Sequence, residues 1–296
     1  MLAWYVPVLL KILISNGLAS IMIKKNVMST SRTKRFLVQF LLCTGFTAVI
    51  SLFSGRFQFS YMTGLIVLVG FFNGFAAYCQ WKAIEISLSK NSLFTFWDDI
   101  IAMTLAWVIL AEGRLLNSRL ILGTCISLIS VCLFTGYEYK KKKGTENERS
   151  PFIFLIYVGI YSFIWGVAVF LIRCFTLKNI GVFTFLPAWY FGASIAAVII
   201  RFKMKDSEKN DLPMSVKDFI SILILSMSVF SGLGAAFLSY QSAPLVIAQP
   251  LFLVGEMIIP ALLGLYLFKE IKYLDFVEKG LFCMAALGSA IIFLNF

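Results

Sequence analysis

The chain has 296 residues, of which 60% are hydrophobic, 16% are aromatic and only 14% are charged, and its mean hydropathy is +0.89. Soluble domains carry about 25% charged residues and lack the serial apolar runs of about 20 residues that recur in this sequence. The composition therefore excludes a soluble domain and predicts an all-α integral membrane protein.

The net charge of +11 does not indicate a nucleic-acid partner, because Lys and Arg gather in the cytoplasmic loops of membrane proteins. The chain has no histidine, which removes the commonest metal ligand and the usual general base. Its six cysteines lie within apolar runs without a CxxC pair, and no metalloprotease, serine-hydrolase or nucleotide-binding signature is present. We predict no enzymatic activity, no cofactor and no metal site.

The predicted elements are ten apolar runs, each long enough to cross a bilayer as a helix. The first run has no basic region before it and is too long for a signal peptide, so we expect it to be retained. The predicted spans are residues 2–23, 36–53, 61–82, 92–111, 119–137, 152–173, 182–200, 216–238, 246–267 and 274–295.

One polar segment, EYKKKKGTENERS from Glu138 to Ser150, precedes Pro151 and divides the ten spans five and five. We predict a first five-helix repeat at 1–137, a basic linker at 138–151 and a second five-helix repeat at 152–296. About twenty Lys and Arg lie in this linker and in the loops on its side, against about five on the other side. This bias predicts a multi-pass protein of the cytoplasmic membrane with the linker inside the cell and both termini outside.

The two halves carry matching residues at constant intervals. Asp98 precedes Glu112 by fourteen residues, and Glu256 precedes Glu270 by the same interval. The first and sixth spans also match at one offset, in the pairs Gly17 with Gly166, Ala19 with Ala168, Ile23 with Ile172 and Lys24 with Arg173. Because each half has an odd number of spans, homologous halves must cross the bilayer in opposite directions. This is the inverted-repeat plan of secondary transporters.

Two stretches resemble the paired repeats of the drug/metabolite transporter superfamily, of the EamA-like ten-span type. They begin AIEISLSKNSLFTFWDDIIAM at Ala83 and SYQSAPLVIAQPLFLVGEMII at Ser239. The family's turn before the fifth span matches Glu112-Gly113-Arg114, and its counterpart in the second half matches Lys269-Glu270. The chain departs from the family in having Asp99 and Met257, where proline often follows the acid, and in its predicted orientation.

The resemblance implies a carrier of a small solute, with a central cavity lined by spans 1, 3, 4, 6, 8 and 9. It does not name the solute, since relatives carry amino acids, other metabolites, sugars or drugs.

The acids Asp98, Asp99 and Glu256 are the main candidates for binding or coupling, because each ionised side chain near the bilayer centre costs about 2.5–3.5 kcal/mol. Asp98 and Asp99 lie about 100° apart on a helix, so we expect Asp98 on the cavity and Asp99 against a neighbouring helix. Lys11, deep in the first span, is expected to pair with Asp98 or Glu256. The alternative is that these charges only hold helices together.

Further polar and aromatic residues within the spans complete the candidate set. Trp165 matches Asn16 across the repeat, and prolines in the ninth span are expected to free backbone carbonyls near the site. The remaining candidates are Asn73, Gln80, Trp97, Gln241 and Gln249.

We predict a secondary active transporter of a small polar metabolite, with amino-acid export by alternating access as the first hypothesis. The partners are the solute and the lipid bilayer, and a proton is a candidate coupling ion because a carboxylate can alternate between dry and wet states. Two alternatives remain, a proton-coupled exporter of cationic compounds and a non-transporting membrane protein with structural charges. A monomer and a homodimer are both left open.

Overall fold

The computed structural model describes residues 5–28, 32–94, 96–112, 151–204, 214–269 and 275–293, together with isolated positions between 118 and 137. Every regular element in these residues is a helix. Eight helical segments of the described residues are long and apolar enough to cross a membrane. The chain is therefore an all-α, multi-pass membrane protein, as its composition predicts.

The first half consists of helices that alternate in direction. The first span is continuous but has a π-helical centre, and the fourth span is made of two helices in succession. The elements are α1 (Tyr5–Lys11), the π-helical segment η1 (Ile12–Ala19), α2 (Ser20–Val27), α3 (Arg32–Ser54), α4 (Tyr61–Ile86), α5 (Leu88–Phe94) and α6 (Phe96–Leu110). The predicted span at 119–137 and the linker at 138–150 lie largely or wholly outside the described residues.

The second half follows the same pattern of long helices. Pro151 begins its first helix, where a missing N–H group costs nothing. The elements are α8 (Pro151–Leu177), α9 (Val182–Met204), α10 (Val216–Ser242), α11 (Leu245–Leu262), the π-helical segment η4 (Leu263–Leu267) and α12 (Phe276–Phe293). Each predicted span apart from 119–137 coincides with one of these helices or helix pairs.

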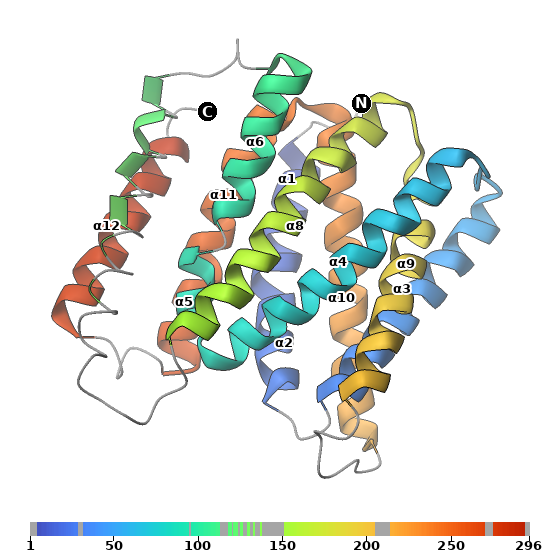
Figure 1. The fold of residues 1–296 in the computed structure, drawn as a ribbon, viewed down its shortest axis with the longest axis horizontal. Helices are drawn as coiled ribbons and strands as arrows, with labels where there is room; N and C mark the ends of the chain where they lie inside the picture. The colour runs from blue at the N-terminus through green and yellow to red at the C-terminus, as the bar shows by residue number, and fades with distance from the viewer. Residues whose placement is uncertain are drawn as a thin grey trace.

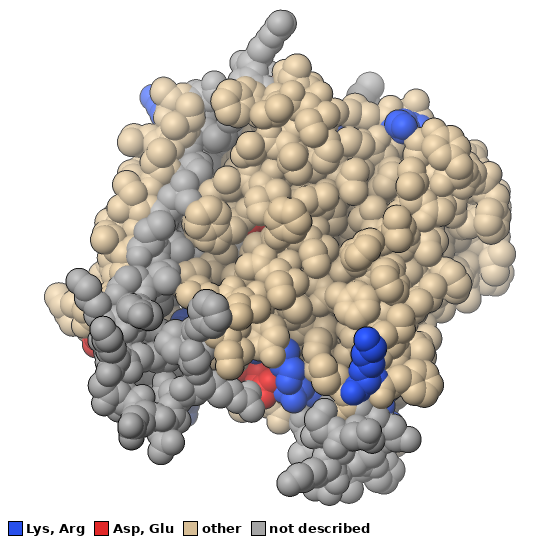
Figure 2. Space-filling model, in the orientation of Figure 1, with Lys and Arg blue, Asp and Glu red and all other residues tan. Residues whose placement is uncertain are grey.

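Figure 1 shows the helices running roughly from top to bottom, with α1 beginning and α12 ending at the upper side. The helices α2, α4 and α9 and the segment η4 end at the lower side, so the spans alternate in direction as predicted. On the face that Figure 2 shows, the middle of the surface is almost free of charge and several Lys and Arg lie near the lower edge. This distribution suits a protein that crosses a bilayer, whose core excludes exposed charge.

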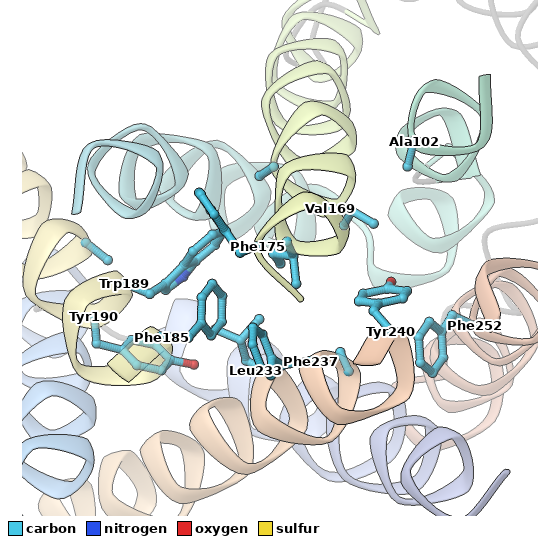
Figure 3. Packing of buried hydrophobic residues seen from close by; sticks show 14 of the residues in the cluster. Ala102, Val169, Phe175, Phe185, Trp189, Tyr190, Leu233, Phe237, Tyr240 and Phe252 are labelled. Carbon is cyan, nitrogen blue, oxygen red and sulfur yellow. The ribbon is translucent and has the colours of Figure 1, made fainter. Parts of the chain in front are cut away.

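Aromatic rings and small residues form the packed centre. Phe185 of α9 stacks on Phe237 of α10, with ring centroids 4.5 Å apart (Figure 3). Where α4 crosses α9, a Cβ on Gly192 would lie 2.8 Å from the backbone nitrogen of Phe71. Only glycine permits this approach, and close backbone contact is how membrane helices gain packing energy without a hydrophobic driving force.

Candidate functional site

A cavity of about 180 Å³ lies among the helices, lined by residues from both halves of the chain. It receives side chains from the first span, α3, α4, α5, α8, α9, α10 and α11. The six spans that the family resemblance implies all contribute, and α3 and α9 contribute as well. The volume is smaller than the roughly 300–1,000 Å³ of pockets for drug-sized molecules, so it suits a small solute.

Lys11 and Glu256 form an ion pair at the wall of this cavity. The Lys11 Nζ atom donates a hydrogen bond to Glu256 Oε1 and lies 4.3 Å from the ring centroid of Phe252. The predicted Lys11 pair is therefore formed with Glu256. The π-helical segment η1 begins directly after Lys11, and such segments occur frequently at functional sites.

Asp98 and Asp99 stand close to this pair. One carboxylate oxygen from each of Asp98, Asp99 and Glu256 lies within 4.8 Å of the others, and the two aspartates are 0% and 1% exposed. Both occupy the first turn of α6, where the helix dipole and free N–H groups favour negative charge. This position explains why an otherwise apolar span can contain two adjacent carboxylates.

The acid cluster, defined as Asp98, Asp99 and Glu256, carries more negative charge than its surroundings offset. Among the described residues, Lys11 is the only cation paired with it. The Oδ2 atoms of Asp98 and Asp99 are buried and have no hydrogen-bond partner among the described residues. If all three acids were ionised, the cluster with Lys11 would keep a net charge of −2, which a low-dielectric site does not tolerate.

Asp99 faces α11, as predicted, and begins a chain of hydrogen bonds. Gln249 Nε2 donates to Asp99 Oδ1, and the Tyr240 hydroxyl donates to Gln249 Oε1. Tyr240 in turn packs edge-on against Phe252, with ring centroids 5.6 Å apart (Figure 3). The chain links the acid cluster to the end of α10 and fixes the orientation of the Asp99 carboxylate.

The first span and α11 meet closely beside the ion pair. A Cβ on Gly255, which precedes Glu256, would lie 2.9 Å from Asn16 Nδ2 and 2.8 Å from Ile12 Cγ2. A larger residue at position 255 would displace the Ile12 and Asn16 side chains, which lie on the same span as Lys11. The glycine thus leaves room for these two side chains beside the ion pair.

The cavity brings together most of the predicted residues but not all of them. Asp98, Asp99 and Gln249 are buried beside the cavity in the acid cluster and its hydrogen-bond chain, so Asp98 does not line the cavity as expected. The predicted residues that line it are Lys11, Asn16, Asn73, Gln80, Trp165 and Glu256.

Two predicted site residues lie elsewhere. The Trp97 side chain is 40% exposed on the outside of α6, because it precedes Asp98 by about 100° on the helix. Gln241 is exposed near the end of α10. Neither residue lines the cavity.

Several lining residues were not predicted. Gln39 on α3, Asn91 on α5, and Tyr161 and Trp189 on α8 and α9 all face the cavity. A buried amide within an apolar helix is a usable signal for Gln39, and the aromatic residues have no signal that separates them from the many that pack helices.

A second buried charged group, at the upper side, joins four helices. Arg173 Nε lies 3.0 Å from Glu112 Oε1, and Arg173 Nη1 donates to the carbonyl oxygen of Tyr240. Glu112 Oε2 accepts hydrogen bonds from the backbone N–H groups of Leu245 and Val246 at 2.9 and 3.3 Å. Glu112 thus caps the N-terminus of α11 while it pairs with the end of α8.

No protein-family model and no curated protein matches this sequence. The fold is similar to that of a solved structure described as "Crystal structure of protein", with a TM-score of 0.68 and 10% sequence identity. The match covers 99% of this chain and 96% of that one. At this identity the likeness extends to the fold alone, and it shows that the arrangement of helices is shared by another protein of about the same length.

Proposed function

We propose that this protein is a secondary active carrier of a small polar metabolite, of which an amino acid is the best candidate, and that it works by alternating access. The observation that carries the proposal is the cavity with the Lys11–Glu256 pair at its wall. An ammonium and a carboxylate side by side offer partners for the carboxylate and ammonium of a zwitterion. When the solute binds, the Lys11–Glu256 pair is replaced by two others: Lys11 pairs with the carboxylate of the solute, and Glu256 pairs with its ammonium group.

The proposed architecture is two inverted five-helix repeats, as in the drug/metabolite transporter superfamily. Equivalent contacts at the two ends of the molecule support it. Lys24 Nζ donates to the carbonyl oxygen of Ile84 near the end of α4, and Arg173 donates to that of Tyr240 near the end of α10. Lys24 and Arg173 are the pair that the sequence repeat matches.

Backbone conformation supports the same repeat. Ala111, after α6, and Lys269, after η4, both adopt positive φ, at 54° and 58°. They are separated by the same interval as Asp98 and Glu256. A positive φ is uncommon for residues with a side chain, so its recurrence at matched positions favours a common origin of the two halves.

The unbalanced charge of the acid cluster supports coupling to a proton. At least one of three carboxylates so close together must take up a proton or another cation, because neighbouring like charges disfavour ionisation of both. A proton that leaves when the cavity opens to water would link its own movement to that of the solute. We propose the cytoplasmic membrane as the location, with the Lys- and Arg-rich loops on the cytoplasmic side.

A thermal-unfolding experiment on the purified protein tests the binding step. A panel of amino acids, amines and sugars is added to the wild type and to Lys11→Met. A ligand at about 100 times its dissociation constant stabilises the folded state by about 2.7 kcal/mol, which is measurable. We expect amino acids to stabilise the wild type and not Lys11→Met. If no amino acid shifts the wild-type transition, the zwitterion proposal is wrong.

The excess of acids favours a second candidate, a proton-coupled exporter of cationic compounds. This function needs the acid cluster but not Lys11. Amines would then stabilise the wild type and Lys11→Met alike, and Asp98→Asn would abolish the effect. The same panel therefore separates the two candidates.

A further inference from the structure

Five carboxamide side chains surround the cavity, and we call them the amide collar: Asn16, Gln39, Asn73, Gln80 and Asn91. Three of them have buried side-chain atoms without a hydrogen-bond partner among the described residues, namely Asn16 Nδ2, Gln39 Oε1 and Asn91 Oδ1. These three residues are at most 5% exposed. Native proteins pair nearly all buried polar groups, so three unpaired amide atoms on residues that line one cavity point to a ligand with matching groups.

Gln39 and Asn91 lie toward the lower end of the cavity, away from the ion pair. Gln39 is in the second turn of α3 and Asn91 in the first turn of α5, and both helices begin at the lower side (Figure 1). Lys11 and Ile23, twelve residues apart on the first span, both line the cavity, so the cavity runs along that span from the ion pair toward the lower side. A solute held by Lys11 and Glu256 would face the end of the cavity that Gln39 and Asn91 line.

The chemistry of this lower end is neutral and hydrogen-bonding. The carboxamides of the collar donate and accept hydrogen bonds, and so does the hydroxyl of Ser92, which also lines the cavity. Lys24 lies near this end, but its Nζ atom is engaged by the Ile84 carbonyl. Lys24 is not among the lining residues, so a charged ligand group here would lose its hydration without a counter-charge in the lining at this end, and an apolar group would leave the unpaired amide atoms without partners.

We infer that the solute is an amino acid with a neutral hydrogen-bonding side chain, for which the carboxamide of glutamine fits best. This inference rests on the proposed function, because the Lys11–Glu256 pair must hold the amino and carboxyl groups. The carboxamide of the solute then donates to Gln39 Oε1 and Asn91 Oδ1 and accepts from an amide N–H of the collar. Trp81, Trp165 and Trp189 line the same cavity and limit the width of the ligand.

Glutamine and methionine are the decisive ligand pair, because they have nearly the same shape and differ in the carboxamide. Their dissociation constants are measured for the purified wild type, together with that of glutamate. We expect glutamine to bind at least about tenfold more tightly than either of the others, since two or three hydrogen bonds distinguish them.

Two variants locate the origin of this preference. Gln39→Met and Asn91→Leu each remove unpaired amide atoms and keep the approximate volume, so each should bring the affinities for glutamine and methionine closer together. The affinity for methionine should stay within about twofold of the wild-type value. Gln241→Met is the matched control, because Gln241 is exposed and outside the cavity, and it should keep the full preference.

The wild-type affinities test the assignment of a neutral polar side chain even if a variant fails to fold, and the variants test the role of the collar. Equal affinities for glutamine and methionine, or tighter binding of glutamate, would overturn the assignment of a neutral polar side chain while amino-acid binding itself stands. Failure of every amino acid to bind would overturn the proposed function as well. A preference for glutamine that survives in both folded variants would show that the collar does not recognise the side chain.

Discussion

Two groups of buried charged residues in this protein differ in how completely their charges and hydrogen-bonding atoms are paired. At the upper side, Glu112 and Arg173 pair with each other, and backbone groups bind the Arg173 Nη1 and Glu112 Oε2 atoms. Beside the cavity, the acid cluster has Lys11 as its only paired cation among the described residues and contains two unpartnered carboxylate oxygens.

This difference in pairing suggests a structural role for the first group and a binding role for the second. Breaking a buried ion pair by removing one partner costs free energy. A pair that joins helix ends, with its hydrogen bonds made, therefore stabilises one arrangement of the helices. An unbalanced cluster gains from taking up a proton or a ligand, so its energy depends on what is bound. The comparison predicts that mutations in the first group affect folding and that neutralising mutations in the second affect coupling.

The largest effect on stability is expected for Arg173→Met. The change leaves Glu112 buried without its counter-charge and removes a hydrogen bond to the Tyr240 carbonyl. Breaking a buried pair in this way costs about 3–5 kcal/mol. Unfolding of the purified protein in denaturant measures the loss. The double variant Arg173→Met with Glu112→Gln should recover part of it, and an unchanged stability in the single variant would contradict a structural role.

A smaller loss, of about 2 kcal/mol, is expected for Lys11→Met. The Glu256 carboxylate borders the cavity and can take up a proton when its partner is lost, which limits the penalty. Adding Glu256→Gln should restore most of the stability without restoring amino-acid binding. If the double variant still bound amino acids as tightly as the wild type, the ion pair would not be the binding site.

The sequence predicts the helices, and it predicts a pair of Lys11 with either Asp98 or Glu256, because charged residues within apolar spans are visible in the sequence. Apolar length predicts the spans, and the match between Asp98 and Glu256 indicates where the charged residues meet. The positions of Asn91 and Trp189 depend on how helices cross, which no local pattern encodes. The error at Trp97 has a similar cause, since the rotation of α6 determines which of three adjacent residues faces inward.

A change of less than about 1 kcal/mol in stability is expected for Asp98→Asn. Removing one uncompensated charge relieves repulsion within the acid cluster, so the folded state should be equally stable or slightly more stable. The side-chain oxygen of the asparagine can still accept the hydrogen bond that Asp98 Oδ1 receives from the Asp99 N–H group. Denaturant unfolding checks this, and a loss as large as that of Arg173→Met would make Asp98 a structural residue.

The smallest effect is expected for Trp97→Leu, which serves as the control for the cluster. The indole is partly exposed on the outside of α6, next to Asp98 in sequence but not in the cavity. Stability should change by no more than about 0.5 kcal/mol, and solute binding should be unchanged. A loss of binding in a folded Trp97→Leu would show that the cavity extends further than its described lining.

Transport in proteoliposomes tests the central claim most directly. Liposomes containing the wild type or Asp98→Asn are loaded with an unlabelled mixture of amino acids, and entry of the labelled mixture is followed with and without a pH gradient. We expect exchange in both proteins and gradient-driven accumulation only in the wild type, because the variant lacks a carboxylate that can carry the proton. The absence of exchange in a folded wild type would contradict the account of a carrier. Equal gradient-driven accumulation in both proteins would contradict the role of Asp98 in coupling.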